Sequence, residues 1–380
     1  MRAVADERLN VLVDDRLIAA LVEGHAAPEA VAEELDYAVE ALGSLTPYLR
    51  QEWRIDQLER LEAAAKLILH HNFMHGVDGA AALQIAQFQK SISFLLKYKP
   101  YAVKCASPLG YSVFLQNPRE GFSFQRHLVH KTEVFHIVRV MAGGFVFLCD
   151  FDSWREIYDP VGFEQWLGGR PDDRYERFRY RPAPGDVFVI DELNVVHTIV
   201  GCVVEEFATV STDMVDRLHD QNAGRDIPPY FNRDRTMSQL RELAYPESSR
   251  LVQAGVGEEH EPARIAPLRL DGGSARVLVD AFVRGCHYRI DEARRGPVLH
   301  DPVRATSVYV TSGSGRVRIG DGAAPGRDHA DSIAVAAGDL LLIAPDVPYA
   351  PSSDGTMPLA FTEHRIRPEV AFSPRAEHAT

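Results

Sequence analysis

Four residues able to bind a metal ion fall in two neighbouring parts of the chain. The segment 121–144 contains His127, His130 and Glu133, and His197 closes a later apolar run. Imidazole and carboxylate groups are ligands of first-row divalent metals. Inward side chains from neighbouring strands of a small barrel can meet at one such ion. We therefore expect all four to be metal ligands, ranked Glu133 and His197 first, then His130, then His127.

Short apolar runs around these residues predict β-structure. VFHIVRV and FVFLCDF are separated by turn residues, and DVFVIDE follows after the insertion 154–184; short runs of this kind are typical of a sandwich or barrel. Strand alternation in the first run puts His136 on the face opposite Glu133, where an outer or intersheet histidine is the expected role. From about Ile265 the β pattern returns. The Gly185-Asp186 turn and its strand resemble Gly338-Asp339 and its strand, which indicates an internal duplication.

The spacing of these residues resembles that of the cupin superfamily. Its first motif has a glycine, a His-x-His pair, a glutamate and a later glycine, and its second runs from a Gly-Asp turn to a histidine. The residues that match are Gly121, His127, His130, Glu133 and Gly143 or Gly144 in the first motif, and Gly185, Asp186 and His197 in the second. The resemblance covers about residues 107–225, with a weaker copy at 275–366.

The resemblance implies a bicupin fold, mainly β with an α-helical N-terminal region and two tandem jelly-roll β-barrel domains. The expected parts are a helical region at 1–98, a metal-binding domain at 99–225, a linker at 226–264 and a degenerate domain at 265–380. In the second copy Tyr349 stands where the metal-binding histidine would be. That domain is expected to have lost its metal and to serve as structural support or a dimer contact.

One departure from the motif bears on the ligand set. His127 and His130 are three residues apart, whereas two histidines on one face of a strand are two residues apart. Either a β-bulge inserts a residue between them, or only one of the two binds the metal.

Further residues are predicted to contact substrate. Gln125 and Tyr111 are candidates for catalytic roles beside Glu133, although a satisfied hydrogen bond in the core would explain either. The candidates for substrate binding are Arg126, Lys131, Trp154 and Gln116. Cations beside strands are more often solvated edge charges. The insertion 154–184 carries aromatic and charged residues and is expected to form a lid over one end of the barrel.

Composition restricts the partners. The chain has 380 residues, and 41 Lys and Arg against 54 Asp and Glu give a formal charge of -13. An acidic surface disfavours nucleic acid and anionic membranes. No apolar run reaches the roughly 20 residues that cross a bilayer, and no signal peptide is evident. We expect a cytoplasmic protein that acts on a small molecule and forms a homodimer.

The open coordination positions on the metal decide the function. With Fe(II), which we favour, a small polar substrate would chelate the metal while dioxygen takes an open position, giving an oxygenase. With Zn or Mn the same site would suit a sugar or sugar-phosphate isomerase or epimerase. A metal- or ligand-binding cupin without turnover is the third hypothesis.

Overall fold

The computed structural model describes the strands and the insertion that follow the predicted helical region. The described residues are 103–106, 110–115, 123–127, 131–209, 215–219, 243–253, 263–302, 304, 306–323, 332–343 and 346–366. The region 1–98 lies outside them. The chain forms two compact units, which are called the N-terminal unit (mainly Val113–Ala266) and the C-terminal unit (mainly Pro267–Val370). Across the described residues, no helix is long and apolar enough to cross a membrane.

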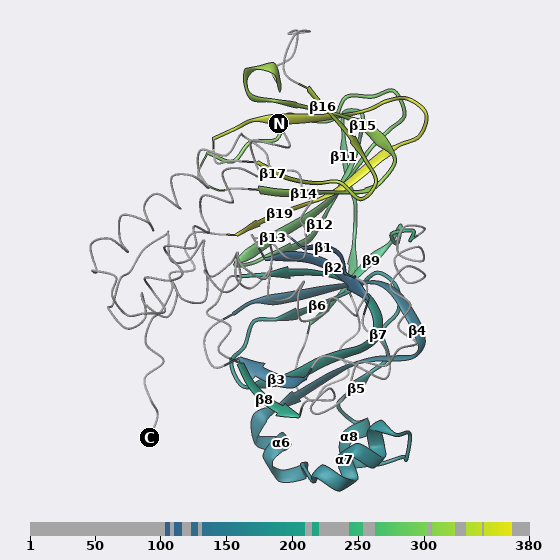
Figure 1. The fold of residues 1–380 in the computed structure, drawn as a ribbon, viewed down its shortest axis with the longest axis vertical. Coiled ribbons are helices and arrows are strands. Elements are labelled where there is room, and N and C mark those ends of the chain that lie inside the picture. Colours follow the sequence, from purple (N-terminus) through teal and green to yellow (C-terminus); the bar gives the residue numbers. More distant parts are fainter. Residues whose placement is uncertain are drawn as a thin grey trace, which may run out of the picture. The chain divides into compact units, whose positions relative to one another are not determined.

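The N-terminal unit is built on one large sheet that folds into two layers (Figure 1). Its strands are β1 (Val103–Ala106), β2 (Tyr111–Leu115), β3 (Phe124–His127), β4 (Glu133–Asp150), β5 (Arg179–Tyr180), β6 (Asp186–Ile190), β7 (Val195–Ala208), β8 (Val215–His219), β9 (Ser249–Gln253) and β10 (Ala263–Ile265). One layer has the order β2-β7-β4-β6, and in the other β3 pairs with β7 and β5 with β4. Two packed layers that share β7 and β4 in this order define a jelly roll.

The long strands β4 and β7 belong to both layers because each bends sharply near its middle. The register of their pairing shifts between Val140 and Phe145. Gly143 and Gly201 at the bend have positive φ angles of 79° and 65°. A Cβ on Gly144 would lie only 2.5 Å from the carbonyl oxygen of Gly201, so the backbones approach too closely there for a side chain. The bend puts Glu133 in one layer and His197 in the other.

Three short helices form the insertion after β4. They are α6 (Phe151–Ile157), α7 (Pro160–Leu167) and α8 (Asp173–Glu176). Each begins after an aspartate whose side chain accepts a backbone N–H of the first turn, and these N-caps are Asp150, Asp159 and Asp172. The caps explain why a polar sequence forms helices at these places.

The insertion packs on the outside of the barrel. Trp154 and Trp166 are buried in an aromatic cluster with Phe124, Phe147 and other residues of β4 and β7. The rings of Trp154 and Phe124 stack at 6.1 Å. Because side chains alternate along β3, Phe124 faces away from the barrel interior when His127 faces into it. The predicted lid is therefore wrong: the helices cover the outer face of one layer.

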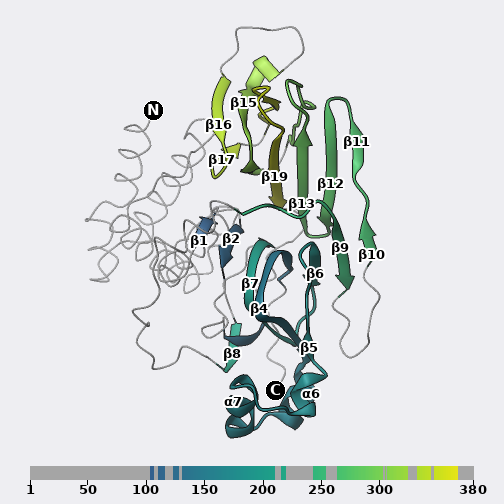
Figure 2. The same cartoon turned by 90° about the vertical axis from the view of Figure 1, so that its right-hand side faces the viewer.

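The C-terminal unit repeats the jelly-roll order (Figures 1 and 2). Its strands are β11 (Leu268–Leu270), β12 (Gly273–Asp280), β13 (Val283–Ile290), β14 (Thr306–Ser312), β15 (Ser314–Ile319), β16 (Ser332–Ala336), β17 (Leu340–Ile343), β18 (Tyr349–Ser353) and β19 (Leu359–Ile366). One sheet runs β11-β12-β13-β19-β14-β17, in which β13-β19-β14-β17 match β2-β7-β4-β6. The other runs β16-β15-β18, and the pairing of Leu299 with Tyr349 extends it. The predicted mainly β fold with two tandem jelly rolls is confirmed.

The two Gly-Asp turns are built alike, as the repeated sequence predicts. Gly185 and Gly338 have φ angles of 93° and 96°. Their N–H groups donate to Ile137 on β4 and Val310 on β14, at 2.7 and 2.8 Å. The carboxylate of the following aspartate accepts the backbone N–H three residues earlier, at 2.8 and 2.9 Å. The predicted domain boundaries and the linker at 226–264 stay predictions, because much of that linker lies outside the described residues.

Candidate metal centre

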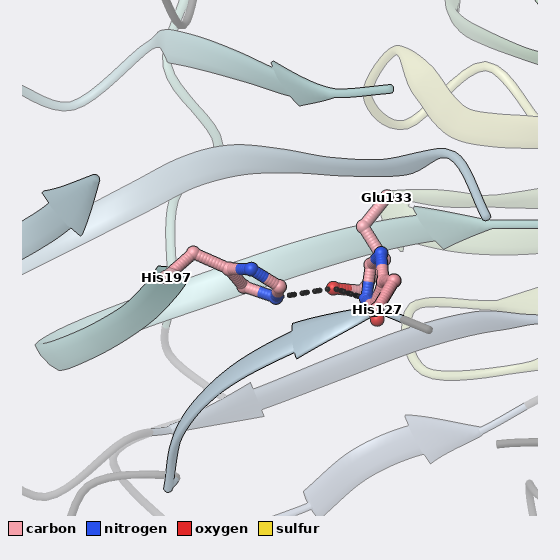
Figure 3. Close-up of side chains that lie close together, drawn as sticks. All are labelled: His127, Glu133 and His197. Atoms are coloured by element: carbon pink, nitrogen blue, oxygen red, sulfur yellow. Dashed lines mark hydrogen bonds and ion pairs between the residues drawn. The ribbon is translucent and has the colours of Figure 1, made fainter. Parts of the chain in front are cut away.

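Three of the four expected ligands meet inside the N-terminal barrel. His127 is the last residue of β3, Glu133 the first of β4, and His197 the third of β7. The Oε2 atom of Glu133 lies 3.1 Å from Nε2 of His197 and 3.3 Å from Nε2 of His127 (Figure 3). One ligand atom from each residue lies within 4.8 Å of the other two. All three side chains are buried.

Strand pairing explains this convergence. Gln125 on β3 pairs with His197 on β7, so the inward side of these two strands carries Gln125, His127 and His197. Glu133 approaches from the opposite layer, and the chain before it is pinned at Thr132. The N–H of Thr132 donates to Oγ1 of Thr209 at 3.0 Å, and its carbonyl accepts the N–H of Thr209 at 2.9 Å.

The pKa values of His127 and Glu133 are shifted in the directions that favour binding of a cation. Burial lowers the pKa of His127 to about 4, despite the opposing pull of Glu133, so its imidazole is neutral near pH 7. Burial alone would raise the pKa of Glu133, but the Lys131 ammonium and the neighbouring His127 hold it well below its usual range. The site thus offers a carboxylate and at least one neutral imidazole.

The nitrogen atoms fit a divalent metal. Nδ1 of His127 is buried and makes no hydrogen bond to the described part of the chain, whereas Nε2 faces Oε2 of Glu133 at 3.3 Å. Nδ1 of His197 lies 3.0 Å from the carbonyl oxygen of Val195 and donates to it, so Nε2 is the ring nitrogen available to a metal. Nε2 faces Oε2 of Glu133 at 3.1 Å, a spacing that either a proton or a metal ion between the two atoms satisfies. Adjacent ligands at 2.0–2.2 Å from one ion are about 3 Å apart, close to the distances seen here.

Lys131 completes the site. Its Nζ contacts Oε1 of Glu133, the oxygen that the two histidines leave, and its side chain is 2% exposed. Lys131 was predicted to bind substrate, and the structure brings it to the ligand group, where it already has an anionic partner.

The remaining predicted residues of the N-terminal unit divide between the two faces of the sheet. Gln125 is half-buried on the inner face, and its Oε1 accepts Oγ of Ser123 at 3.2 Å. Arg126 lies on the outer face, where it bonds Asp216 and lies over the ring of Phe151. Trp154 packs on that outer face too. The structure therefore does not bring Arg126 or Trp154 to the ligand group.

Tyr111, the first residue of β2, groups with the C-terminal unit, whereas β2 from Val113 onward belongs to the N-terminal unit. Within the C-terminal unit its ring lies 5.9 Å from that of Tyr309 and 6.0 Å from that of His364. The structure therefore does not assign it a catalytic position beside Glu133. His130 and Gln116 lie outside the described residues, so their roles stay predictions.

Two buried residues of the other layer complete this account. His136 faces outward as predicted, and its Nδ1 lies 2.8 Å from Oε2 of Glu205 while its Nε2 lies 3.3 Å from Oγ of Ser249. These bonds join β4, β7 and β9. Glu206 was missed by sequence reasoning: it pairs with Phe135, which puts it on the inner face with Glu133. The bend at Gly201 breaks the alternation that would have revealed Glu206 by counting from His197.

The interior of the C-terminal unit has a different chemistry. The hydroxyl of Tyr349 donates to Oε1 of Glu363, the guanidinium of Arg365 contacts the same oxygen, and Tyr288 donates to Oε2 at 3.3 Å. Burial, and next Glu363, raise the pKa of Tyr349 well above its usual value, which keeps it a donor. Tyr349, which stands in the position of the metal-binding histidine, thus donates a hydrogen bond to the buried carboxylate of Glu363. The absence of a metal from this unit stays a prediction.

Comparisons with known proteins found similar solved structures. No family model matches the chain, and no curated protein matches its sequence. Among solved structures, oxalate decarboxylase from Bacillus subtilis at pH 4.6 is similar with 16% identity and a TM-score of 0.40, covering 67% of this chain and 66% of that one. A mutant of the same enzyme has 16% identity, a TM-score of 0.41 and coverage of 67% of each chain. The strand order itself, rather than this likeness, defines the tandem jelly roll.

The stability of the metal-free protein should depend on pH through His127. Unfolded histidine has a pKa near 6.5, and the folded value is about 4. As pH falls through this window, the unfolded state takes up a proton that the folded state does not, so stability is lost. The loss at pH 5 is about 2 kcal/mol. Urea unfolding with EDTA should show this extra loss between pH 7.5 and pH 5 in the wild type and not in His127→Gln. Equal pH dependence in both proteins would contradict it.

Trp154→Ala should destabilise the protein without emptying the site. Removing a buried tryptophan costs about 3–5 kcal/mol because it leaves a large cavity. Trp154→Phe keeps an aromatic ring and should cost much less. We expect the thermal midpoint to fall in that order while Mn(II) binding to the folded protein stays at the wild-type level in both variants. Loss of Mn(II) binding from folded Trp154→Ala would restore a role for this residue at the site.

Proposed function

We propose that this protein is a metal-dependent oxygenase that binds Fe(II) and acts on a small polar metabolite. The observation that carries the proposal is the meeting of His127, His197 and Glu133 inside the N-terminal barrel. Two histidines and one carboxylate with open positions are the ligand set of mononuclear non-heme Fe(II) oxygenases. The resemblance of the sequence motifs to those of cupins supports a metal-binding barrel.

Each ligand residue has a distinct part in holding the ion. His127 offers an imidazole that burial keeps neutral, and His197 presents Nε2 because the carbonyl of Val195 holds the other ring nitrogen. Glu133 supplies the negative charge, and Lys131 keeps it ionised. When bound, Fe(II) supplies redox chemistry and open coordination positions for a substrate. Three protein ligands occupy half of the six positions of an octahedral ion.

The surroundings of the ligands restrict access of water. The exposed fractions of His127, His197 and Glu133 are 2%, 2% and 4%. The ring of Phe135 lies 6.4 Å from that of His197 and adds an apolar wall. A dry site strengthens the attraction between charged groups and protects a reactive centre from side reactions. Enclosure of this kind favours a small substrate.

A Zn- or Mn-dependent isomerase or epimerase is the second candidate. The observation that favours it is Lys131, since a buried lysine beside a metal can move protons between carbon atoms. Its Nζ is, however, already engaged with Glu133. We therefore favour the oxygenase, and the metal that the protein carries separates the two hypotheses.

The test is metal analysis joined to an oxygen-uptake assay. Protein purified anaerobically without added metal should contain Fe, and a substrate from a panel of small polar metabolites should cause oxygen consumption. Zn or Mn with no oxygen consumption, but with isomerisation of a sugar phosphate, would support the second candidate. Stoichiometric metal with no turnover of either kind would indicate a binding protein and contradict the proposal.

Glu133→Ala should lose metal and activity. Without its carboxylate the site has no anionic ligand, so we expect Fe content to fall at least tenfold and oxygen consumption to reach background. Glu192→Ala removes an exposed glutamate of the same unit and is the control, expected to behave as wild type. Circular dichroism should show that both variants keep their β-structure. Full metal content in Glu133→Ala would refute the ligand assignment.

A further inference from the structure

The two oxygens of the Glu133 carboxylate have different partners. Oε2 faces Nε2 of both histidines, at 3.1 and 3.3 Å (Figure 3). Oε1 contacts the ammonium of Lys131. The two oxygens therefore have different roles: Oε2 faces the expected metal position, and Oε1 is paired with Lys131.

The Lys131 contact belongs to the buried part of the site. The side chains of Lys131 and Glu133 are 2% and 5% exposed. Burying an ammonium group is costly unless an anion pairs with it, and Glu133 is that anion. Residues 131 and 133 are also held at a fixed spacing, because both backbone groups of Thr132 bond Thr209. A flexible surface lysine would have neither constraint.

We propose that Lys131 is a positioning residue that reserves Oε1, so that Glu133 binds a divalent ion through Oε2 alone. The inference rests on the metal site of the proposed function and deepens it. A carboxylate can bind an ion through one oxygen or through both. With one, the three protein ligands leave three of six positions open. If both oxygens bind, the protein leaves two positions open, which is one fewer than a chelating substrate and a co-substrate need together.

This role differs from the substrate binding predicted for Lys131. A substrate-binding ammonium would act on the affinity for substrate and leave the metal's own ligands unchanged. A purely structural ion pair would act on stability. A positioning role changes the number of water molecules on the metal before any substrate is added.

The experiment uses Mn(II) as the probe and counts its water ligands. The full-length protein is loaded with Mn(II), and pulsed EPR in D₂O counts the exchangeable waters on the ion. In Lys131→Met, Oε1 is released and can bind the ion, so we expect one water fewer than in the wild type. Lys131→Arg keeps a cationic donor and should keep the wild-type count. Should Lys131→Met fail to fold, Lys131→Ala is measured in its place.

The outcomes separate the two proposals. An unchanged water count in Lys131→Met, with Mn(II) still bound, overturns the positioning role whatever happens to activity or stability. The same drop in both Lys131→Met and Lys131→Arg overturns it too, because the donor would then be irrelevant. Failure of the wild type to bind either Mn(II) or Fe(II) would instead refute the metal site and the proposed function.

Discussion

A single buried carboxylate organises the N-terminal barrel. Glu133 is ionised in an interior where an isolated negative charge would be very costly, so the fold must surround it with groups that carry or accept positive charge. The Lys131 ammonium supplies positive charge at one oxygen, and Nε2 of each of two imidazoles lies beside the other oxygen. The bend in β4 and β7 makes this arrangement possible, because it brings His197 from one layer close to Glu133 from the other.

The two units pair the polar side chains of their interiors in different ways. Each is a jelly roll with a glycine-aspartate turn of the same geometry, and each places polar side chains in its interior. In the C-terminal unit Glu363 is satisfied by Tyr349, Tyr288 and Arg365. In the N-terminal unit the buried Nδ1 of His127 has no such partner among the described residues. One interior is closed by its own side chains, and the other brings together three side chains of the kinds that bind a divalent metal.

Much of this could be predicted from residue types and spacing. The β runs, the repeated turn and the importance of Glu133 and His197 follow from local sequence. The pairing of Gln125 with His197 puts His127 on the inner face, and the ranking of His130 above His127 stays a prediction because residue 130 lies outside the described residues. The lid was wrong because the apolar faces of the helices match Phe124 and Phe147 on the outer surface, and sequence does not reveal which face of a strand an insertion will cover. Lys131 was expected to be an edge charge, and the structure shows it buried against Glu133.

The helical insertion has a consequence for how such barrels diversify. By wrapping tryptophans and phenylalanines against the back of a sheet, α6, α7 and α8 thicken the wall behind β3 and β7 without entering the cavity. The strands that present His127 and His197 are thereby stiffened from outside. The orientation of the imidazoles therefore depends on packing from outside the barrel as well as on contacts within it.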